Sequence, residues 1–262
     1  MPKQRLISYA QHQEDLLLFS LLHQIENGFY IDIGAGDPVI LSATKLFYDR
    51  GWRGFNIEPL PAAYAKLCAQ RPYDINLCVG IGGRVESLPL LEAGRNSVFV
   101  RNTPTDAACQ PDGSPNISRL ASWIPAGIPA WPLSHVTPIY PLTDIVPEYI
   151  DTNRQPIHFC KIGVEGFEKD VLEGIDFSVI RPWVFAIESA MPNTMIPCHQ
   201  AWESILSANG YSFIGAASIN RYYADEARMD LVDRSLSGDT MTREYEVVMS
   251  NPLELAEHAA YA

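Results

Sequence analysis

Short apolar runs alternate with amphipathic stretches along most of the chain. Residues 8–26 predict an amphipathic helix, with Ser8 as its N-cap and Leu16, Phe19 and Leu22 on one face. Beyond Asn27-Gly28, β-rich runs predict strands at 29–33, 55–58, 75–81, 157–162 and 184–188. The stretches between and after them predict helices at 42–50, 61–70, 142–150, 168–174 and 200–209. Strands that alternate with helices in this way indicate a parallel sheet with crossover helices.

The predicted fold is therefore α/β, with an open, mostly parallel sheet and helices on both of its faces. Residues 211–214 and 246–249 predict two terminal strands, which we expect to form an antiparallel edge. With 262 residues, of which 47% are hydrophobic, the chain is long enough for one well-buried core. We divide it into an N-terminal helical segment, 1–28, and one large domain, 29–262.

A proline-rich insertion interrupts this alternation at about 101–141. Eight prolines lie within these 41 residues, and proline both fixes φ and removes a backbone donor. We therefore expect a long irregular excursion, which Trp123 and Trp131 would pack against another surface. It fits a flap on the substrate side, a contact between subunits, or a structural flap without a partner. The oligomeric state stays open, a dimer included.

Charge and composition exclude several classes of protein. The net charge of −12 repels phosphate backbones, so we expect no nucleic-acid partner. No apolar stretch approaches the roughly 20 residues that a membrane span needs, and the N-terminus lacks the layout of a signal peptide. The five cysteines are widely spaced and include no C-x-x-C pair, which favours free thiols. We therefore expect a cytoplasmic protein without a membrane partner.

A glycine-rich turn follows the first predicted strand of the sheet. Residues 29–33 lead directly into Gly34-Ala35-Gly36, where a ligand could approach the backbone closely. Glu58 ends the next strand, and a carboxylate at that place can accept two hydrogen bonds from a ribose diol. The pattern predicts a nucleoside site at the carboxyl edge of the sheet, although a tight turn without a ligand has the same sequence.

Two kinds of cofactor share this layout. A dinucleotide site prefers a third glycine, but Val39 stands at that position, and Asp37 would repel a pyrophosphate. Asp32 and Asp37 would instead suit an ammonium group. S-adenosylmethionine carries an amine, a sulfonium and a ribose, so the pattern favours this cofactor over NAD.

Several separated blocks of the sequence resemble the FkbM-type methyltransferases. Together they span most of the chain in order: Ser8-Tyr9-Ala10-Gln11 with Glu14-Asp15, Tyr30-Ile31-Asp32-Ile33-Gly34-Ala35, Gly51-Trp52-Arg53-Gly54-Phe55-Asn56-Ile57-Glu58-Pro59, Arg71-Pro72-Tyr73-Asp74-Ile75-Asn76, residues 161–169 and Asn220-Arg221-Tyr222-Tyr223. The resemblance implies a class I methyltransferase (Rossmann-like) fold for residues 29–262, with S-adenosylmethionine as methyl donor. It also implies O-methylation of a small-molecule hydroxyl substrate, such as a sugar or a secondary metabolite. The cofactor positions it implies are Asp32, Gly34, Ala35, Gly36, Glu58, Asp74 and Ile75.

One departure from the family pattern affects the predicted catalytic residues. The family normally has Lys-Ile-Asp-Val-Glu-Gly where this chain has Lys161-Ile162-Gly163-Val164-Glu165-Gly166. Our candidate for the catalytic base is Glu165, with Lys161 and Glu188 beside it. Two carboxylates would hold a divalent metal more weakly than three, so we assign no metal ligands. Gly163 leaves open a cofactor-binding module without catalysis, and an NAD-dependent oxidoreductase is the other alternative.

Overall fold

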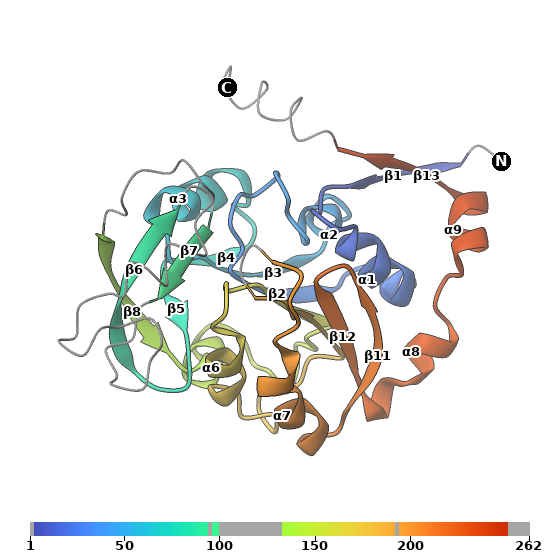
Figure 1. Ribbon diagram of the computed structural model, residues 1–262. Helices are drawn as coiled ribbons and strands as arrows, with labels where there is room; N and C mark the ends of the chain where they lie inside the picture. Colours follow the sequence, from blue (N-terminus) through green and yellow to red (C-terminus); the bar gives the residue numbers. More distant parts are fainter. Residues whose placement is uncertain (1–2, 94–95, 100–132, 192–193, 251–262) are drawn as a thin grey trace.

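A seven-stranded sheet forms the centre of the molecule (Figure 1). The computed structural model describes residues 3–93, 96–99, 133–191 and 194–250. Within these ranges, the strands of the sheet lie in the order β11-β12-β10-β9-β2-β3-β4. Their bounds are β2 Phe29–Ile33, β3 Arg53–Ile57, β4 Ile75–Leu77, β9 Phe159–Ile162, β10 Val184–Glu188, β11 Tyr211–Ala217 and β12 Asn220–Asp225. The predicted strands at 29–33, 55–58, 157–162 and 184–188 are thus confirmed, each to within two residues.

The seven-stranded sheet is mixed, so the expectation of a mostly parallel sheet holds only in part. Neighbouring strands from β4 to β10 run parallel, whereas β12 runs antiparallel to both β10 and β11. The antiparallel strand therefore lies inside the sheet and not at its edge. The prediction that residues 246–249 join this edge was wrong. They lie in β13 (Tyr245–Met249), which pairs in parallel with β1 (Gln4–Ser8) in a separate two-stranded sheet.

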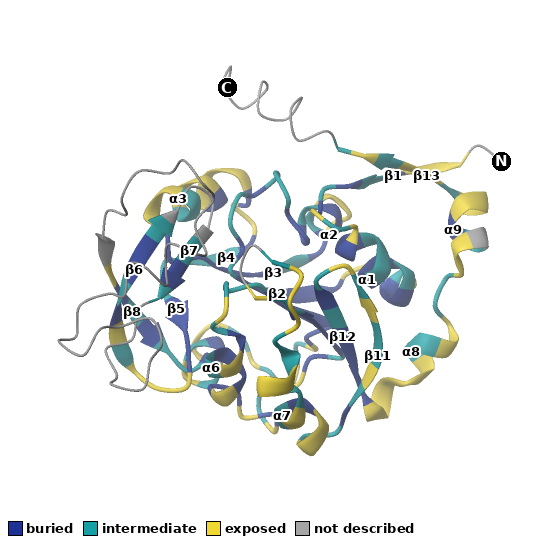
Figure 2. Ribbon diagram, viewed as in Figure 1, coloured by how far each residue is buried: buried dark blue, intermediate teal, exposed yellow. Residues whose placement is uncertain are grey.

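Apolar side chains cover both faces of the central sheet. Alternate residues of β2 point to opposite faces, so Ile31 and Ile33 join one hydrophobic cluster and Tyr30 joins the other. The first cluster contains side chains of α5 (Leu142–Ile145), α6 (Glu168–Glu173) and α7 (Glu203–Ala208). The second contains side chains of α1 (Glu14–Leu22) and α2 (Lys45–Asp49). The central strands are accordingly buried, and α6 and α7 have exposed residues whereas α1 has none (Figure 2). The predicted helices on both faces are confirmed.

A second sheet of four strands lies beside the first, on the left in Figure 1. Its order is β5-β8-β6-β7, with β5 Gly80–Ile81, β6 Glu86–Ala93, β7 Asn96–Phe99 and β8 Leu133–Tyr140. Two predictions are corrected here. The strand predicted at 75–81 is divided between β4 and β5, which belong to different sheets. The irregular excursion predicted at 101–141 ends in the regular strand β8, while residues 101–132 lie outside the described ranges.

The N-terminal segment contains a strand before its helix. The predicted helix at 8–26 begins only at Glu14, because Ser8 ends β1 and its hydroxyl donates to Asp15 at 2.7 Å instead of capping a helix. The carboxylate of Asp15 also accepts the backbone N–H groups of Tyr9 and Leu16. The remaining helices are α3 Pro61–Gln70, α8 Asp230–Asp233 and α9 Gly238–Glu244, with short 3-10 turns at Val146–Glu148, His199–Ala201 and Glu226–Arg228. Among the described helices, none has the length and apolar character needed to cross a membrane.

Candidate functional site

A cavity of about 390 Å³ opens at the carboxyl ends of β2, β3, β9 and β10. Ligands of open α/β sheets bind at this edge, and the volume lies within the usual range for small-molecule sites. The second sheet supplies part of the wall through Gly80, Glu92, Ser97 and Phe99. Eight of the ten residues that the sequence singled out border this cavity, and they come from all four strands or the turns that follow them: Asp32, Gly34, Ala35, Gly36, Glu58, Lys161, Glu165 and Glu188.

The glycine turn after β2 brings the backbone against the neighbouring strands. Gly34 has φ +80°, and a Cβ atom there would lie 1.9 Å from the carbonyl oxygen of Gly163. The N–H groups of Gly34 and Ala35 both donate to the carbonyl of Ile57, at 2.9 and 3.2 Å. Gly36 also has a positive φ, +61°, and a Cβ there would meet nothing within 4 Å. Glycine at position 34 is therefore required both by backbone conformation and by space.

Glu58 connects the glycine turn that follows β2 to the segment that follows β3. Its carboxylate accepts the N–H of Gly36 and the N–H of Leu60, both at 2.8 Å, through different oxygens. Burial raises the pKa of Glu58, although the two backbone hydrogen bonds oppose that shift. A carboxylate offers about four acceptor positions, so one on each oxygen is left for a ligand in the cavity. The geometry suits a pair of neighbouring hydroxyls.

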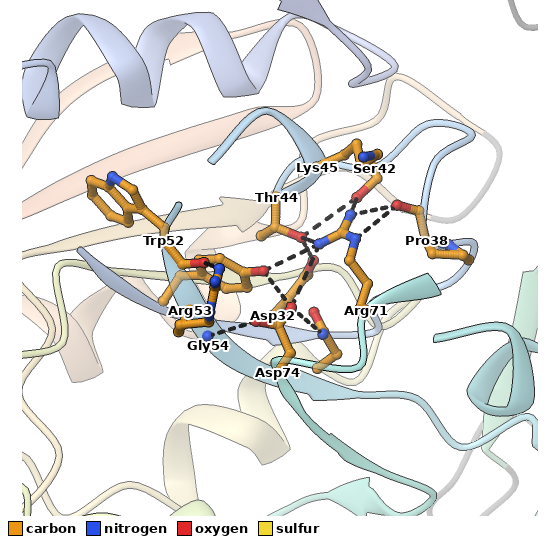
Figure 3. A network of polar contacts seen from close by, with 12 residues as sticks. Asp32, Pro38, Ser42, Thr44, Lys45, Trp52, Arg53, Gly54, Arg71 and Asp74 are labelled. Carbon is orange, nitrogen blue, oxygen red and sulfur yellow. Dashed lines mark hydrogen bonds and ion pairs between the residues drawn. The ribbon is translucent and has the colours of Figure 1, made fainter. Parts of the chain in front are cut away.

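Asp32 is held from behind by a buried hydrogen-bond network (Figure 3). The Thr44 hydroxyl donates to Asp32 at 2.7 Å, and the fully buried guanidinium of Arg71 donates to Thr44 at 3.4 Å. Arg71 also donates to the carbonyl of Pro38 and the hydroxyl of Ser42. One arginine thus fixes the loop from Pro38 to Thr44, which borders the cavity, and orients the group that holds Asp32. Burial raises the pKa of Asp32, while Lys161 lowers it.

Asp74 and Ile75 are the two predicted cofactor residues that do not border the cavity as the described residues form it. The carboxylate of Asp74 accepts from the Tyr30 hydroxyl at 2.6 Å and from the N–H of Gly54 at 3.0 Å, and it lies 3.8 Å from Arg71. It is therefore part of the buried network of Figure 3, behind the sheet edge. Ile75 begins β4 and packs against the first hydrophobic cluster. The cofactor roles of these two residues stay predictions, and in the structure both side chains make contacts that stabilise the fold.

Asp37, which the sequence offered as a partner for an ammonium group, already has three donors. The N–H groups of Val39 and Ile40 and the ammonium of Lys66 all lie 3.0 Å from its carboxylate. These bonds outweigh the effect of burial and lower the pKa of Asp37. Its main role is to close the turn after Gly36.

Glu165 stands on a strained turn between β9 and α6. Its φ is +52°, which is uncommon for a residue with a side chain and recurs at functional sites. Burial, then Glu188 and Glu168, raise the pKa of Glu165 to about 7, against a smaller opposing effect of Lys161. The buried carboxylate of Glu168 shapes the turn by accepting the N–H groups of Val164 at 3.3 Å and Gly166 at 3.1 Å. A carboxylate with a pKa near neutrality is suited to proton transfer.

Carboxylates outnumber ammonium groups around the cavity. Its border contains two lysines, Lys66 and Lys161, and seven acidic residues: Glu14, Asp32, Asp37, Glu58, Glu92, Glu165 and Glu188. Even so, the described ranges contain no group of three histidine, cysteine or acidic side chains placed to hold a metal ion. The arrangement instead provides single carboxylates at separate positions, suited to hydrogen bonds and to positively charged ligands.

Sequence reasoning missed the residues that act through the tertiary structure. Arg71 and Thr44 have no sequence signal for their role, because the contacts that define it span 12 to 41 residues. Gln11 and Glu14 border the cavity from the N-terminal segment, to which the sequence analysis assigned no site residue. Glu168 could have been found, since an acid placed after a strand–turn–helix boundary commonly accepts the free N–H groups there.

Comparison with known proteins shows which family the chain belongs to. A search of the solved structures finds a precorrin-6y C5,15-methyltransferase from Geobacter metallireducens GS-15, with a TM-score of 0.36 and 13% sequence identity, covering 82% of this chain and 88% of that one. No curated protein matches the chain. The model of the methyltransferase FkbM domain matches residues 32–213, from the acid before the glycine turn to β11. This match covers more than two thirds of the sequence, and the chain therefore belongs to the FkbM methyltransferase family.

Proposed function

We propose that this protein is an S-adenosylmethionine-dependent O-methyltransferase that acts on a hydroxyl of a sugar or a small secondary metabolite. The observation that carries the proposal is the cavity itself, where the glycine turn, Glu58 and Glu165 meet within one volume of about 390 Å³. Family membership supports methyl transfer. The carboxylates around the cavity support S-adenosylmethionine as the methyl donor, and the resemblance of the sequence to the FkbM-type methyltransferases supports an oxygen acceptor.

The cofactor residues fit S-adenosylmethionine in three respects. Glu58 keeps free acceptor positions toward the cavity for the two ribose hydroxyls. Gly36 leaves open space where a side chain would stand, so that the ligand can contact the backbone. The excess of carboxylates suits the positive charges of the amine and the sulfonium. The bound donor would supply a methyl carbon attached to a positively charged sulfur, which is open to in-line attack by an oxygen.

Glu165 is our candidate for the base that takes the hydroxyl proton. It borders the same cavity, and the described residues donate no hydrogen bond to its carboxylate, which leaves it available to a substrate. Glu165 would take the proton of the acceptor hydroxyl, and the lone pair of that oxygen would attack the methyl carbon that bound S-adenosylmethionine would supply, with the thioether as the leaving group. A positioned base contributes about 10²–10⁴-fold to such a step.

Calorimetric titration with S-adenosylmethionine and with NAD tests the choice of cofactor. We expect the first to bind and the second not to bind, because Asp37 and Val39 disfavour a pyrophosphate. Glu58→Ala should weaken S-adenosylmethionine by about 1–3 kcal/mol, through loss of charge-assisted hydrogen bonds. Glu173→Gln is a control, since this half-exposed acid of α6 pairs with Lys169 and does not border the cavity. An unchanged affinity of the Glu58 variant would reject the ribose assignment.

Transfer of a labelled methyl group to a panel of monosaccharides and polyols tests the reaction. We expect labelled product with the wild type, and a loss of turnover in Glu165→Gln that exceeds any loss of S-adenosylmethionine affinity. Equal turnover in the two proteins would exclude Glu165 as the base. Binding of S-adenosylmethionine without transfer to any acceptor in the panel would instead favour a binding module without catalysis.

A further inference from the structure

The ammonium group of Lys161 lies where a side chain at position 163 would begin. Lys161 and Gly163 are two residues apart at the end of β9 and point to the same side of the sheet. A Cβ atom built on Gly163 would lie 2.2 Å from Lys161 Nζ and 3.2 Å from Glu188 Oε2. Gly163 does not have a positive φ, so its backbone conformation does not require glycine. The space that a side chain at this position would take is occupied instead by the Lys161 ammonium, the far end of a flexible side chain.

Lys161 is a buried charge that borders the cavity without a bonded partner. The residue is only 7% exposed, and within the described ranges its Nζ makes no hydrogen bond and no ion pair. Burial alone would lower the pKa of Lys161, but the nearby carboxylates of Glu188, Asp32 and Glu14 raise it above its ordinary value, which keeps the group charged at neutral pH. The N–H groups of this ammonium therefore have no acceptor among the described residues, and an oxygen of a ligand in the cavity would be a suitable acceptor for one of them.

We propose that Lys161, in the space that Gly163 leaves free, donates a hydrogen bond to the acceptor oxygen and so holds it for methyl transfer. This inference rests on the proposed function. Lys161 keeps its protons throughout, while the proton of the hydroxyl goes to Glu165. The ammonium favours the negative charge that develops on the oxygen as this proton leaves. On this proposal, glycine at position 163 does not indicate a protein that has lost catalysis. The absence of a side chain there leaves room for the Lys161 ammonium in the site.

The first test uses the protein alone and examines the shared space. Gly163→Ala and Lys161→Ala are made singly and together, and the midpoint of thermal unfolding is measured for all four proteins. In the presence of Lys161, the new methyl group must displace the ammonium, so Gly163→Ala should lower the midpoint. In the Lys161→Ala background this loss should largely disappear, because the two residues are coupled. An equal loss in both backgrounds would overturn the placement of Lys161.

The second test measures the role of Lys161 in catalysis. With the sugar or polyol that gives the highest wild-type turnover, Lys161→Met should lower kcat by about 10²-fold, the usual effect of removing one donor to a developing oxyanion. Affinity for S-adenosylhomocysteine, measured by calorimetry, should stay within about threefold, because the lysine acts on the acceptor. Lys169→Met, an exposed lysine of α6, is the matched control.

Each outcome decides between the two proposals. A kcat of Lys161→Met equal to that of the wild type would overturn this inference and leave the proposed function intact. A wild type that binds no S-adenosylhomocysteine would overturn the proposed function itself. Loss of kcat in Lys161→Met, with retained S-adenosylhomocysteine affinity and a coupled unfolding cycle, would support both.

Discussion

The raised pKa of Glu165 makes a quantitative prediction about the pH dependence of turnover. The base must be ionised to accept a proton, and its pKa in the free protein is raised to about 7, first by burial and then by Glu188 and Glu168. A group of that pKa is about one tenth ionised at pH 6 and about nine tenths ionised at pH 8. We therefore expect kcat/KM for S-adenosylmethionine to rise roughly tenfold over this interval.

An ordinary glutamate gives a different curve. With a pKa of about 4.5, the base would already be about 97% ionised at pH 6, and the rate would be nearly flat from pH 6 to 8. Initial rates of labelled methyl transfer across this range, in buffers of constant ionic strength, separate the two cases. A flat profile for the wild type would refute the account of Glu165 as a base whose pKa is raised by its surroundings.

The cause of the raised pKa of Glu165 can be tested with a second variant. Glu188→Gln removes one of the negative charges that raise the pKa of Glu165, so the rise in rate should move to lower pH. Glu173→Gln removes an acid outside the cavity and should leave the profile in place. If the Glu188 variant kept the wild-type profile, burial and Glu168 would account for the raised pKa without Glu188.

Three further predictions concern the scaffold of the site. Arg71→Met should cost about 3–5 kcal/mol in the free energy of unfolding by urea, since it breaks a fully buried charge network. Gly34→Ala should destabilise the fold by more than Gly51→Ala in the same assay: both glycines have positive φ, but only at Gly34 would a Cβ meet the carbonyl of Gly163. The pKa of Glu168 is raised to about 7, so the folded state binds the proton of this carboxyl more tightly than the unfolded state does. The free energy of unfolding should therefore fall by about 2–3 kcal/mol as pH rises from 4.5 to above 7. Glu168→Gln should remove that part of the fall, and an unchanged slope would contradict the assignment.

Local sequence signals predicted the part of the site that lies along single strands. The run from Phe29 to Gly36 combines a fully buried strand with two glycines, and the structure places it at the edge of the cavity. Glu58, Glu165 and Glu188 were found because each follows or ends an apolar run that becomes a strand. For such residues, position along the chain determines position at the sheet edge.

Predictions from the sequence failed where contacts between distant segments of the chain determine the structure. Residues 245–249 have the composition of a sheet strand, but their partner is Gln4–Ser8 at the other end of the chain. Asp74 follows an arginine by three residues, and only the folded chain shows that both belong to a buried network around Tyr30. At position 163 the sequence shows only an absent carboxylate, whereas the structure shows that a Cβ atom there would lie 2.2 Å from Lys161 Nζ.

The central claim is that the cavity beside the glycine turn binds a nucleoside whose ribose lies against Glu58. A crystal structure of the complex with S-adenosylhomocysteine tests it most directly. We expect both ribose hydroxyls within hydrogen-bonding distance of the Glu58 carboxylate, with the sulfur facing the side of the cavity that contains Lys161 and Glu165. A ligand bound elsewhere, or a ribose that makes no contact with Glu58, would contradict the account.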